Sequence, residues 1–378
     1  MNRPAILAWR LGALGDTLLL LPALAALRAA FPGREIVAAG NRSALEAALW
    51  SGLVDWAIDA SDARLAPLSR GMAPAGGILP ANLECAIVWS NRHAELCRGL
   101  ALAGARKVIG APAIPAGNTP AAAHYLDTLA ALEIRPVPFR LQAPPRAMER
   151  TAMAWQAAMG RQAGQRAIVL HPGAGSPLKQ WPAGHYVQLA QLLRAEGFAV
   201  LWSCGPADDA VRAALDAAGE SAHILASTDL AGLAAYLTRA AAMVSGDCGV
   251  AHLAALLDIP ALALFGPTDY RVWGPPGARH AVVHLNMICS PCGEMAKRCP
   301  TRICLRGLAV RTVYEALLDH VAHANGAHTT SGRDRQAGSC APGALRCPPP
   351  VSGPPGLLQV ARWAGGRTPR ERWWTGTG

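Results

Sequence analysis

The sequence predicts an α/β protein built from two doubly wound domains. Short apolar, strand-like runs alternate with Ala- and Leu-rich runs of helical spacing along most of the chain, which is typical of a parallel sheet covered by helices. This alternation occurs twice, and a proline-rich linker at residues 135–146 separates the two series. With 378 residues, of which 52% are hydrophobic, the chain is long enough to bury two ordinary cores.

The first series predicts an N-terminal domain over residues 1–142. Its strand-like runs are residues 5–9, 35–39, 56–59 and 85–90, which are short and rich in β-branched, aliphatic or Trp residues. Helical spacing follows at 18–30 and 94–103, and we expect the first helix to begin at Thr17. The segment between residues 10 and 16 is then a loop at the carboxyl edge of the sheet.

The second series predicts a C-terminal domain over residues 143–325. Strand-like runs at 167–170, 199–203, 243–245 and 261–265 are separated by helical runs at 183–195, 207–217, 230–240 and 250–257, and the last packed helix is expected at 310–322. Residues 326–378 have clustered Pro and Gly without a hydrophobic period, which predicts a disordered tail. Since open α/β sheets bind ligands beyond the carboxyl ends of their strands, we expect both domains to present sites to a shared cleft.

Charge and hydropathy limit the class of partner. The formal net charge is +10, but the seven arginines after residue 325, against Asp334 and Glu371, account for half of it. The remaining charge is spread without a basic run, which argues against a nucleic-acid partner and favours a phosphate-bearing or other anionic substrate. Asp16 and Pro22 interrupt the apolar run near the N-terminus, and no stretch approaches the roughly 20 apolar residues of a membrane span. We therefore expect a cytoplasmic protein, with peripheral contact at the inner membrane left open.

The stretch RLGALGDTLLLLP at residues 10–22 is the first candidate site. Gly12 and Gly15 permit a tight turn and close approach of a ligand, and Arg10 is a candidate contact for an anionic acceptor. Asp16 has two interpretations. It could cap the first helix, or its carboxylate could face the cleft as a general base.

A second candidate lies at HPGAGSPLKQWP, residues 171–182, between a strand and a helix. Gly173, Gly175 and Ser176 could turn backbone amides toward a phosphate while Lys179 supplies positive charge. The Walker spacing is absent. The alternative is a Gly- and Pro-rich turn with a solvated lysine.

The stretch SGDCGVAHLA at residues 245–254 again follows a strand and opens a helix. Asp247 could accept hydrogen bonds from sugar hydroxyls, and Cys248 and Gly249 lie where a helix N-terminus would favour a diphosphate. His252 is either part of this site or a packed core histidine. Asp208 or Asp209, after the preceding strand, could bind a ribose or cap a helix, and GPTD at 266–269 ends a further strand.

Four cysteines follow in the stretch CSPCGEMAKRCPTRICL. Their C-x2-C-x6-C-x4-C spacing suits a structural zinc or iron site, and reduced or redox-labile thiols are the alternative. The four are Cys289, Cys292, Cys299 and Cys304. Neither interpretation makes a metal part of catalysis.

Together, RLGALGD, HPGAGSPLKQWP, SGDCGVAHLA and FGPTD resemble the heptosyltransferase family, glycosyltransferase family nine, over about residues 4–323. The resemblance implies a GT-B fold, a nucleotide-sugar donor such as ADP-heptose, a lipopolysaccharide-core or other anionic glycolipid acceptor, inversion at the anomeric carbon and no catalytic metal. It implies that Asp16 is the base, that Lys179 and Asp247 contact the donor, that Asp209 lies near the ribose and that Arg10 lies near the acceptor. Asp209 stands where glutamate is usual in the family.

Two other classes of protein remain open. A nucleotide-sugar epimerase or hydrolase would share the two-domain fold but would have no acceptor face. A non-enzymatic sugar- or lipid-binding protein would bind the donor without turnover. Free nucleoside diphosphate formed without sugar transfer would favour the first of these.

Overall fold

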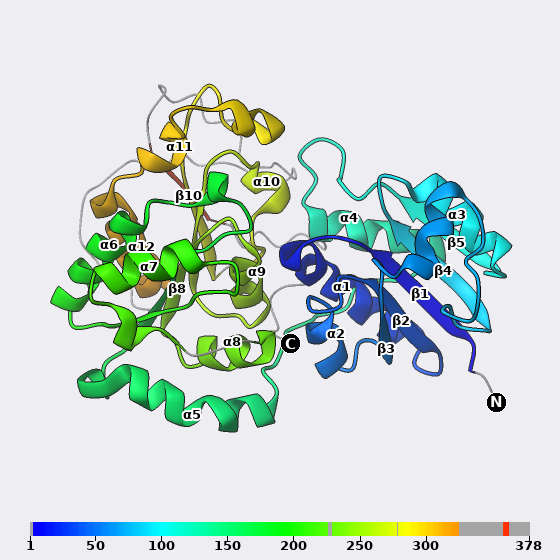
Figure 1. Ribbon diagram of the computed structural model, residues 1–378, viewed down its shortest axis with the longest axis horizontal. Coiled ribbons are helices and arrows are strands. Elements are labelled where there is room, and N and C mark those ends of the chain that lie inside the picture. Colours follow the sequence, from blue (N-terminus) through cyan, green and yellow to red (C-terminus); the bar gives the residue numbers. More distant parts are fainter. Residues whose placement is uncertain (1–2, 226–228, 278, 325–357, 363–378) are drawn as a thin grey trace, which may run out of the picture.

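Two parallel sheets form the centres of two α/β domains that lie side by side (Figure 1). The computed structural model describes residues 3–225, 229–277, 279–324 and 358–362. The first domain contains β1 (Ala5–Arg10), α1 (Leu14–Ala30), β2 (Glu35–Gly40), α2 (Glu46–Trp50), β3 (Trp56–Asp59), the 3-10 helix η1 (Ala63–Arg70), β4 (Leu83–Trp89), α3 (His93–Leu102), β5 (Lys107–Ala111), α4 (Ala121–Thr128) and η2 (Leu129–Leu132).

The second domain follows a stretch without regular structure at residues 133–144. It contains α5 (Pro145–Met159), η3 (Gly160–Gln162), β6 (Ala167–His171), η4 (Pro177–Lys179), α6 (Ala183–Ala195), β7 (Ala199–Trp202), α7 (Asp209–Ala217), η5 (Ser221–His223), α8 (Leu230–Leu237), β8 (Ala242–Gly246), α9 (Gly249–Leu256), β9 (Ala261–Phe265), α10 (Tyr270–Trp273), β10 (His280–Leu285), η6 (Gly293–Arg298), α11 (Ile303–Arg306), α12 (Val310–Ala324) and β11 (Leu358–Arg362). Among the described helices, none is long and apolar enough to cross a membrane.

Strand order places the loops that matter at the points where each sheet reverses direction. The first sheet has the order β3-β2-β1-β4-β5, so its reversal lies between β1 and β4. The second has the order β11-β10-β9-β8-β6-β7, and its reversal lies between β6 and β8. Ligands of doubly wound folds bind at such points. The loop after β1 carries residues 11–13, and the loops after β6 and β8 carry residues 172–176 and 247–248.

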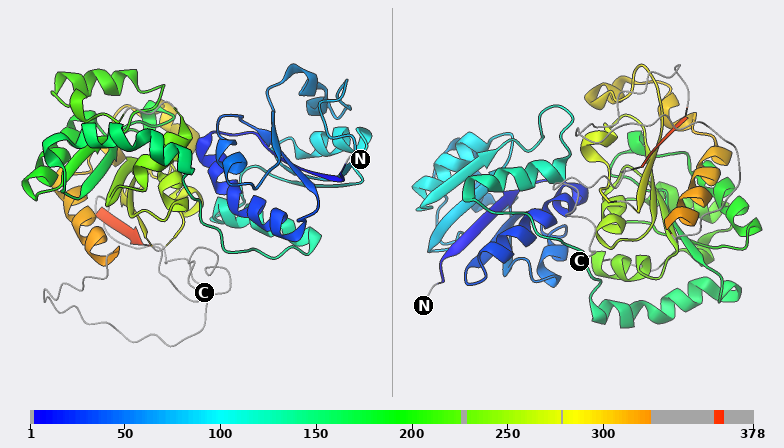
Figure 2. Two further views of the ribbon diagram at one scale, coloured as in Figure 1. Left: turned by 90° about the horizontal axis from the view of Figure 1, so that it is seen from below. Right: turned by 180° about the vertical axis from the view of Figure 1, so that it is seen from behind.

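The described strands are parallel except β11, which pairs antiparallel with β10 (Figure 2). Five residues of the expected tail therefore belong to the second sheet, so the prediction of disorder is wrong for residues 358–362. They form backbone pairs with Ala281 to Leu285, and β10 would otherwise be the sheet edge. The rest of the predicted tail, residues 326–357 and 363–378, lies outside the described residues.

The two domains share buried apolar surface. One continuous cluster includes Leu18 and Leu21 of α1 together with Val250 and Leu253 of α9. The linker adds a backbone hydrogen bond from Leu141 N to Leu256 O at 2.8 Å. Burying apolar surface across the junction holds α1 and α9 against each other.

The first helix begins three residues earlier than the sequence predicts. Ala13 is the residue before α1, and Asp16 is its third residue, with Oδ2 accepting a hydrogen bond from Ala13 N at 2.9 Å. Asp16 therefore closes the first turn from inside the helix and is not its N-cap. A carboxylate at the third position can satisfy the backbone N–H at the N-cap in this way.

Candidate active site at the junction of the two domains

Asp16 is tied to Arg10 at the carboxyl end of β1. Arg10 Nη2 lies 2.7 Å from Asp16 Oδ1, and Arg10 Nε donates to the Tyr125 hydroxyl at 3.0 Å. Arg10 is only 5% exposed, and a third hydrogen bond joins its guanidinium to the carbonyl of Leu11. These contacts orient the Asp16 carboxylate. The buried position of Arg10 therefore favours a positioning role and does not favour the expected contact with an acceptor.

Gly12 makes this compact loop possible. A Cβ added to Gly12 would lie 2.7 Å from both Cβ and Oδ2 of Asp16 and 2.8 Å from Arg10 Nη1. A larger side chain would therefore displace the carboxylate or the guanidinium. Gly12 has a packing reason to be glycine, whether or not a ligand approaches it.

The C-terminal domain places Lys179 against Asp247. Lys179 Nζ, from the end of η4, lies 2.9 Å from Asp247 Oδ2, from the loop after β8. The Asp247 side chain is 7% exposed and that of Lys179 is 36% exposed. The ion pair therefore has a buried anion and a cation that solvent can reach.

His252 of α9 is buried at the contact between the two domains, where its ring lies against Gly15 of α1. It is 5% exposed, and its Nδ1 has no hydrogen-bond partner among the described residues. Burial lowers the pKa of His252 to about 4, while the carboxylates of Asp247 and Asp16 act to raise it. The imidazole is therefore neutral at pH 7, and its ring packs against Gly15 of the N-terminal domain.

Glycines bring the N-termini of α1 and α9 into contact. A Cβ added to Gly15 would lie 2.9 Å from Cδ2 of His252 and 3.6 Å from Cα of Gly249. A Cβ added to Gly249 would lie 2.6 Å from Cγ of Leu14. The two helix N-termini, each with positive dipole character, thus meet beside Asp16 and Asp247.

Cys248 is the residue before α9 and faces the buried His171 at the end of β6. Burial acts to raise the pKa of the Cys248 thiol, but the imidazole of His171 outweighs it, so that this pKa is lowered. The ring of His171 is held by its Nδ1, which lies 2.9 Å from the carbonyl oxygen of Ser203. These contacts link the ends of β6, β7 and α9.

The remaining predicted donor residues are placed differently from one another. Gly173 packs directly on the buried Asp208 carboxylate, whereas Gly175 faces open space. Ser176 Oγ accepts a hydrogen bond from Leu178 N at 3.3 Å and so caps η4. Asp209 begins α7 with an exposed side chain, and within the described chain no hydrogen bond or ion pair joins it to Lys179 or Asp247.

Tyr125 has no role that the sequence predicts, whereas Asp208 is one of the two adjacent aspartates predicted to bind a ribose or cap a helix. Asp208 is 6% exposed, and its Oδ2 accepts a hydrogen bond from Gly205 N at 2.6 Å. Tyr125 lies 115 residues from Arg10 in the chain, so no local spacing could indicate their contact. The sequence does not distinguish Asp208 from Asp209, but the structure does, because Asp208 is buried and Asp209 is exposed.

The cysteines of residues 289–304 do not fit the expected metal site. All four are free thiols, from the exposed Cys289 to the buried Cys304. Across the described chain, no three or more His, Cys, Asp or Glu side chains are placed to hold a metal ion. Cys299 instead accepts a hydrogen bond from Arg302 N at 3.3 Å, and this bond lowers its pKa.

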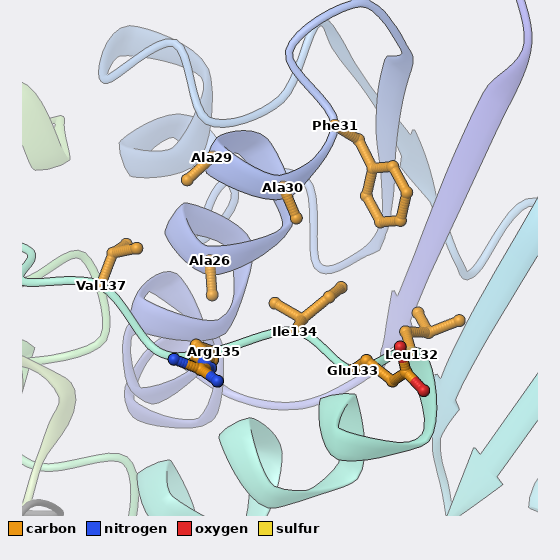
Figure 3. Close-up of a pocket in the computed structure, with 9 residues that line it drawn as sticks. All are labelled: Ala26, Ala29, Ala30, Phe31, Leu132, Glu133, Ile134, Arg135 and Val137. Carbon is orange, nitrogen blue, oxygen red and sulfur yellow. The ribbon is translucent and has the colours of Figure 1, made fainter.

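A pocket of about 360 Å³ lies away from this junction (Figure 3). It is open to solvent and is lined by the last turn of α1, by Phe31 just after it, and by residues between the end of η2 and Val137. Glu133 and Arg135 are the charged residues of its lining, and none of the predicted catalytic residues borders it. Its position makes it part of the domain connection.

Part of the sequence is similar to known glycosyltransferases. Residues 119–302 match the family model of glycosyltransferase family 9 (heptosyltransferase). The lipopolysaccharide heptosyltransferase 1 of Pseudomonas aeruginosa is 38% identical over 126 residues, which are 33% of this chain and 35% of that protein. The sequence match therefore spans about a third of the length of this curated relative.

Solved structures share the fold over most of the chain. The family 9 glycosyl transferase of Veillonella parvula has a TM-score of 0.66 at 17% identity, covering 85% of this chain and 98% of that one. The ADP-heptose LPS heptosyltransferase II of E. coli has a TM-score of 0.64 at 20% identity, covering 85% and 99%. The fold is accordingly GT-B, and residues 119–302 are similar in sequence to glycosyltransferase family 9.

Proposed function

We propose that the protein transfers heptose from ADP-heptose to a lipopolysaccharide-core glycan with inversion at the anomeric carbon, at the cytoplasmic face of the inner membrane. The names of the P. aeruginosa relative and of the E. coli structure support this substrate class. The observation that carries the proposal is the contact of the N-termini of α1 and α9 through Gly15 and Gly249, which brings the loop of Asp16 in one domain to the loop of Asp247, the partner of Lys179, in the other.

Asp16 is the proposed general base. Its oxygens accept hydrogen bonds from Arg10 and Ala13, and each keeps a lone pair that could accept the proton of an acceptor hydroxyl. The acceptor oxygen would attack the anomeric carbon as its proton passes to Asp16, and the bond from that carbon to the diphosphate would break. Attack from the face opposite the leaving group gives inversion.

Lys179 is the proposed partner of the leaving diphosphate. Its side chain is part-exposed, so a phosphate can replace or share its contact with Asp247. The N-terminus of α9, at Cys248 and Gly249, adds a partial positive charge. We propose that these groups hold the charge of released ADP without a metal cofactor, and that Asp247 takes a sugar hydroxyl when Lys179 turns to phosphate.

A transfer assay tests the proposal directly. The full chain is incubated with ADP-heptose and a heptose-deficient lipopolysaccharide acceptor, and both ADP release and the anomeric configuration of the product are followed. We expect one ADP for each heptose transferred and an inverted linkage. ADP release without transfer, on an acceptor that a known family member uses, would favour a hydrolase, and donor binding without turnover would favour a binding protein.

A further inference from the structure

The segment from the end of β10 through α11, residues 286–306, carries exposed apolar side chains together with cationic ones. It is called the connector below. Ile288 is 96% exposed, Met295 62% and Ile303 46%. The same residues contain four cations, Lys297, Arg298, Arg302 and Arg306, against the single anion Glu294. An exposed apolar group rimmed by one sign of charge marks an interaction surface.

The connector is held in place on the loops of the candidate donor site. The backbone N–H groups of Cys292 and Gly293 both donate to Pro267 O at 2.9 Å, and Arg302 Nη1 donates to Pro177 O at 2.8 Å. Cys304 and Leu305 are buried, and the side chain of Leu305 packs on Gly266. The exposed side chains therefore project from an anchored segment on the same side of the domain as the loops after β6 and β9.

We propose that residues 286–306 form a membrane-contact surface that binds anionic phospholipid bilayers. Charge complementarity indicates the partner. Lys297 is paired with Glu294, and Arg302 donates to Pro177. Arg298 and Arg306 are exposed and have no ion-pair partner among the described residues, so they can meet phosphate headgroups. Clustered cations near a membrane surface are attracted by anionic lipid.

The apolar residues supply the second part of the contact. Exposure to water is unfavourable for the apolar side chains of Ile288, Met295 and Ile303. Their transfer to the boundary between headgroups and acyl chains would lower the free energy. Binding here would turn the donor loops toward the bilayer. That consequence for a lipid-linked acceptor rests on the proposed function, whereas the membrane contact does not.

Vesicle sedimentation of the full chain tests the contact without using its activity. The vesicles contain phosphatidylcholine with phosphatidylglycerol, or phosphatidylcholine alone. We expect binding to the anionic vesicles that weakens as salt is added. The double variant R298Q/R306Q should lose roughly 10- to 30-fold in the partition coefficient, since each cation near the surface contributes about fivefold. Ile288→Ser should weaken binding and reduce its salt-resistant part.

The control variant R146Q/R161Q removes the same charge from exposed positions in α5 and η3. Helix α5 lies at the opposite end of the C-terminal domain from α11 (Figure 1), so this variant should bind as the wild type does. The basic residues after position 325 are present in every protein compared. Unchanged binding by R298Q/R306Q, or no wild-type binding to anionic vesicles, would overturn the proposal, as would an Ile288→Ser variant that alters only the oligomeric state.

Discussion

At the scale of single residues, Asp16 combines a structural contact with the proposed chemistry. In Asp16→Asn, the amide oxygen can still accept from Arg10 or from Ala13 N, but the NH2 group cannot accept from the other. The buried Arg10 also loses its charged partner, so we expect a loss of about 1.5–3 kcal/mol in the free energy of unfolding. The transfer rate should fall by roughly 10²- to 10⁴-fold, because an amide cannot take a proton.

Isothermal calorimetry with ADP should give nearly the same affinity for Asp16→Asn as for the wild type, since Lys179 is untouched. Asp127→Asn is a suitable control, because Asp127 is exposed on α4 of the same domain. If Asp16→Asn keeps full transfer activity while unfolding more easily, Asp16 serves only the first turn of α1.

Lys179→Ala should weaken ADP binding by roughly 10- to 100-fold, since a charge-assisted hydrogen bond contributes about 1.5–3 kcal/mol. The substitution also leaves the buried Asp247 without its cation, which costs stability. The double variant K179A/D247N separates these effects. Its melting temperature should recover toward that of the wild type while ADP binding stays weak. Recovery of both would mean that Lys179 acts only as the partner of Asp247.

At the scale of elements, the contact between α1 and α9 depends on small residues. In Gly249→Ala the new methyl group would meet the Leu14 side chain, so the two helices must separate. We expect at least a tenfold lower transfer rate, because the proposed base and the proposed phosphate site lie on opposite sides of this contact. Removing the obstructing side chain in L14A/G249A should restore part of that rate.

Gly184→Ala provides the matched control for this pair. Gly184 lies in α6 with nothing within 4 Å of an added Cβ, so alanine should be neutral or stabilise the helix by about 0.5–1 kcal/mol. A Gly249→Ala protein as active as Gly184→Ala would show that catalysis does not need the close contact of α1 with α9.

At the scale of the whole molecule, the strands at the centre of each sheet could be predicted except β10, and so could the edge strands β3 and β7, whereas the edge strands β5 and β11 could not. β1, β6, β8 and β9 are continuous apolar runs because both faces of each strand are covered, and the sequence shows this. β5 is an edge strand with only Ala111 buried, and β11 pairs across a long separation in sequence. Neither pattern differs from that of a loop.

The candidate site also has parts that the sequence could predict and parts that it could not. Its glycine-rich loops follow buried strands, so their places could be predicted from the order of the elements. The contacts of Arg10 with Tyr125 and of Gly249 with Leu14 join residues far apart in the chain, and no spacing encodes them. The domain boundaries at residues 142 and 143 stay a prediction.

Buried histidines make the stability of the whole fold depend on pH. Burial lowers the pKa of His252 to about 4, and burial followed by the charge of His320 lowers that of His280 to about 3. An unfolded histidine has a pKa of about 6.5, so below that pH the unfolded chain binds more protons than the folded one. The free energy of unfolding should therefore decrease as the pH falls from about 6.5 toward 4, by up to roughly 1.4 kcal/mol per pH unit for each histidine.

Urea unfolding at several pH values between 7 and 4 would measure this dependence. Comparing the slope of the free energy of unfolding against pH in His280→Asn and in the wild type gives the contribution of that one histidine. Substituting His280 alters the stability at every pH, but only the loss of its titration changes the slope. We expect the slope to fall by about one proton, and the contribution of His280 to be absent above pH 7, where its imidazole is neutral in both the folded and the unfolded chain. A slope equal to that of the wild type would mean that His280 is protonated within the folded protein, in conflict with its burial at 1% exposure.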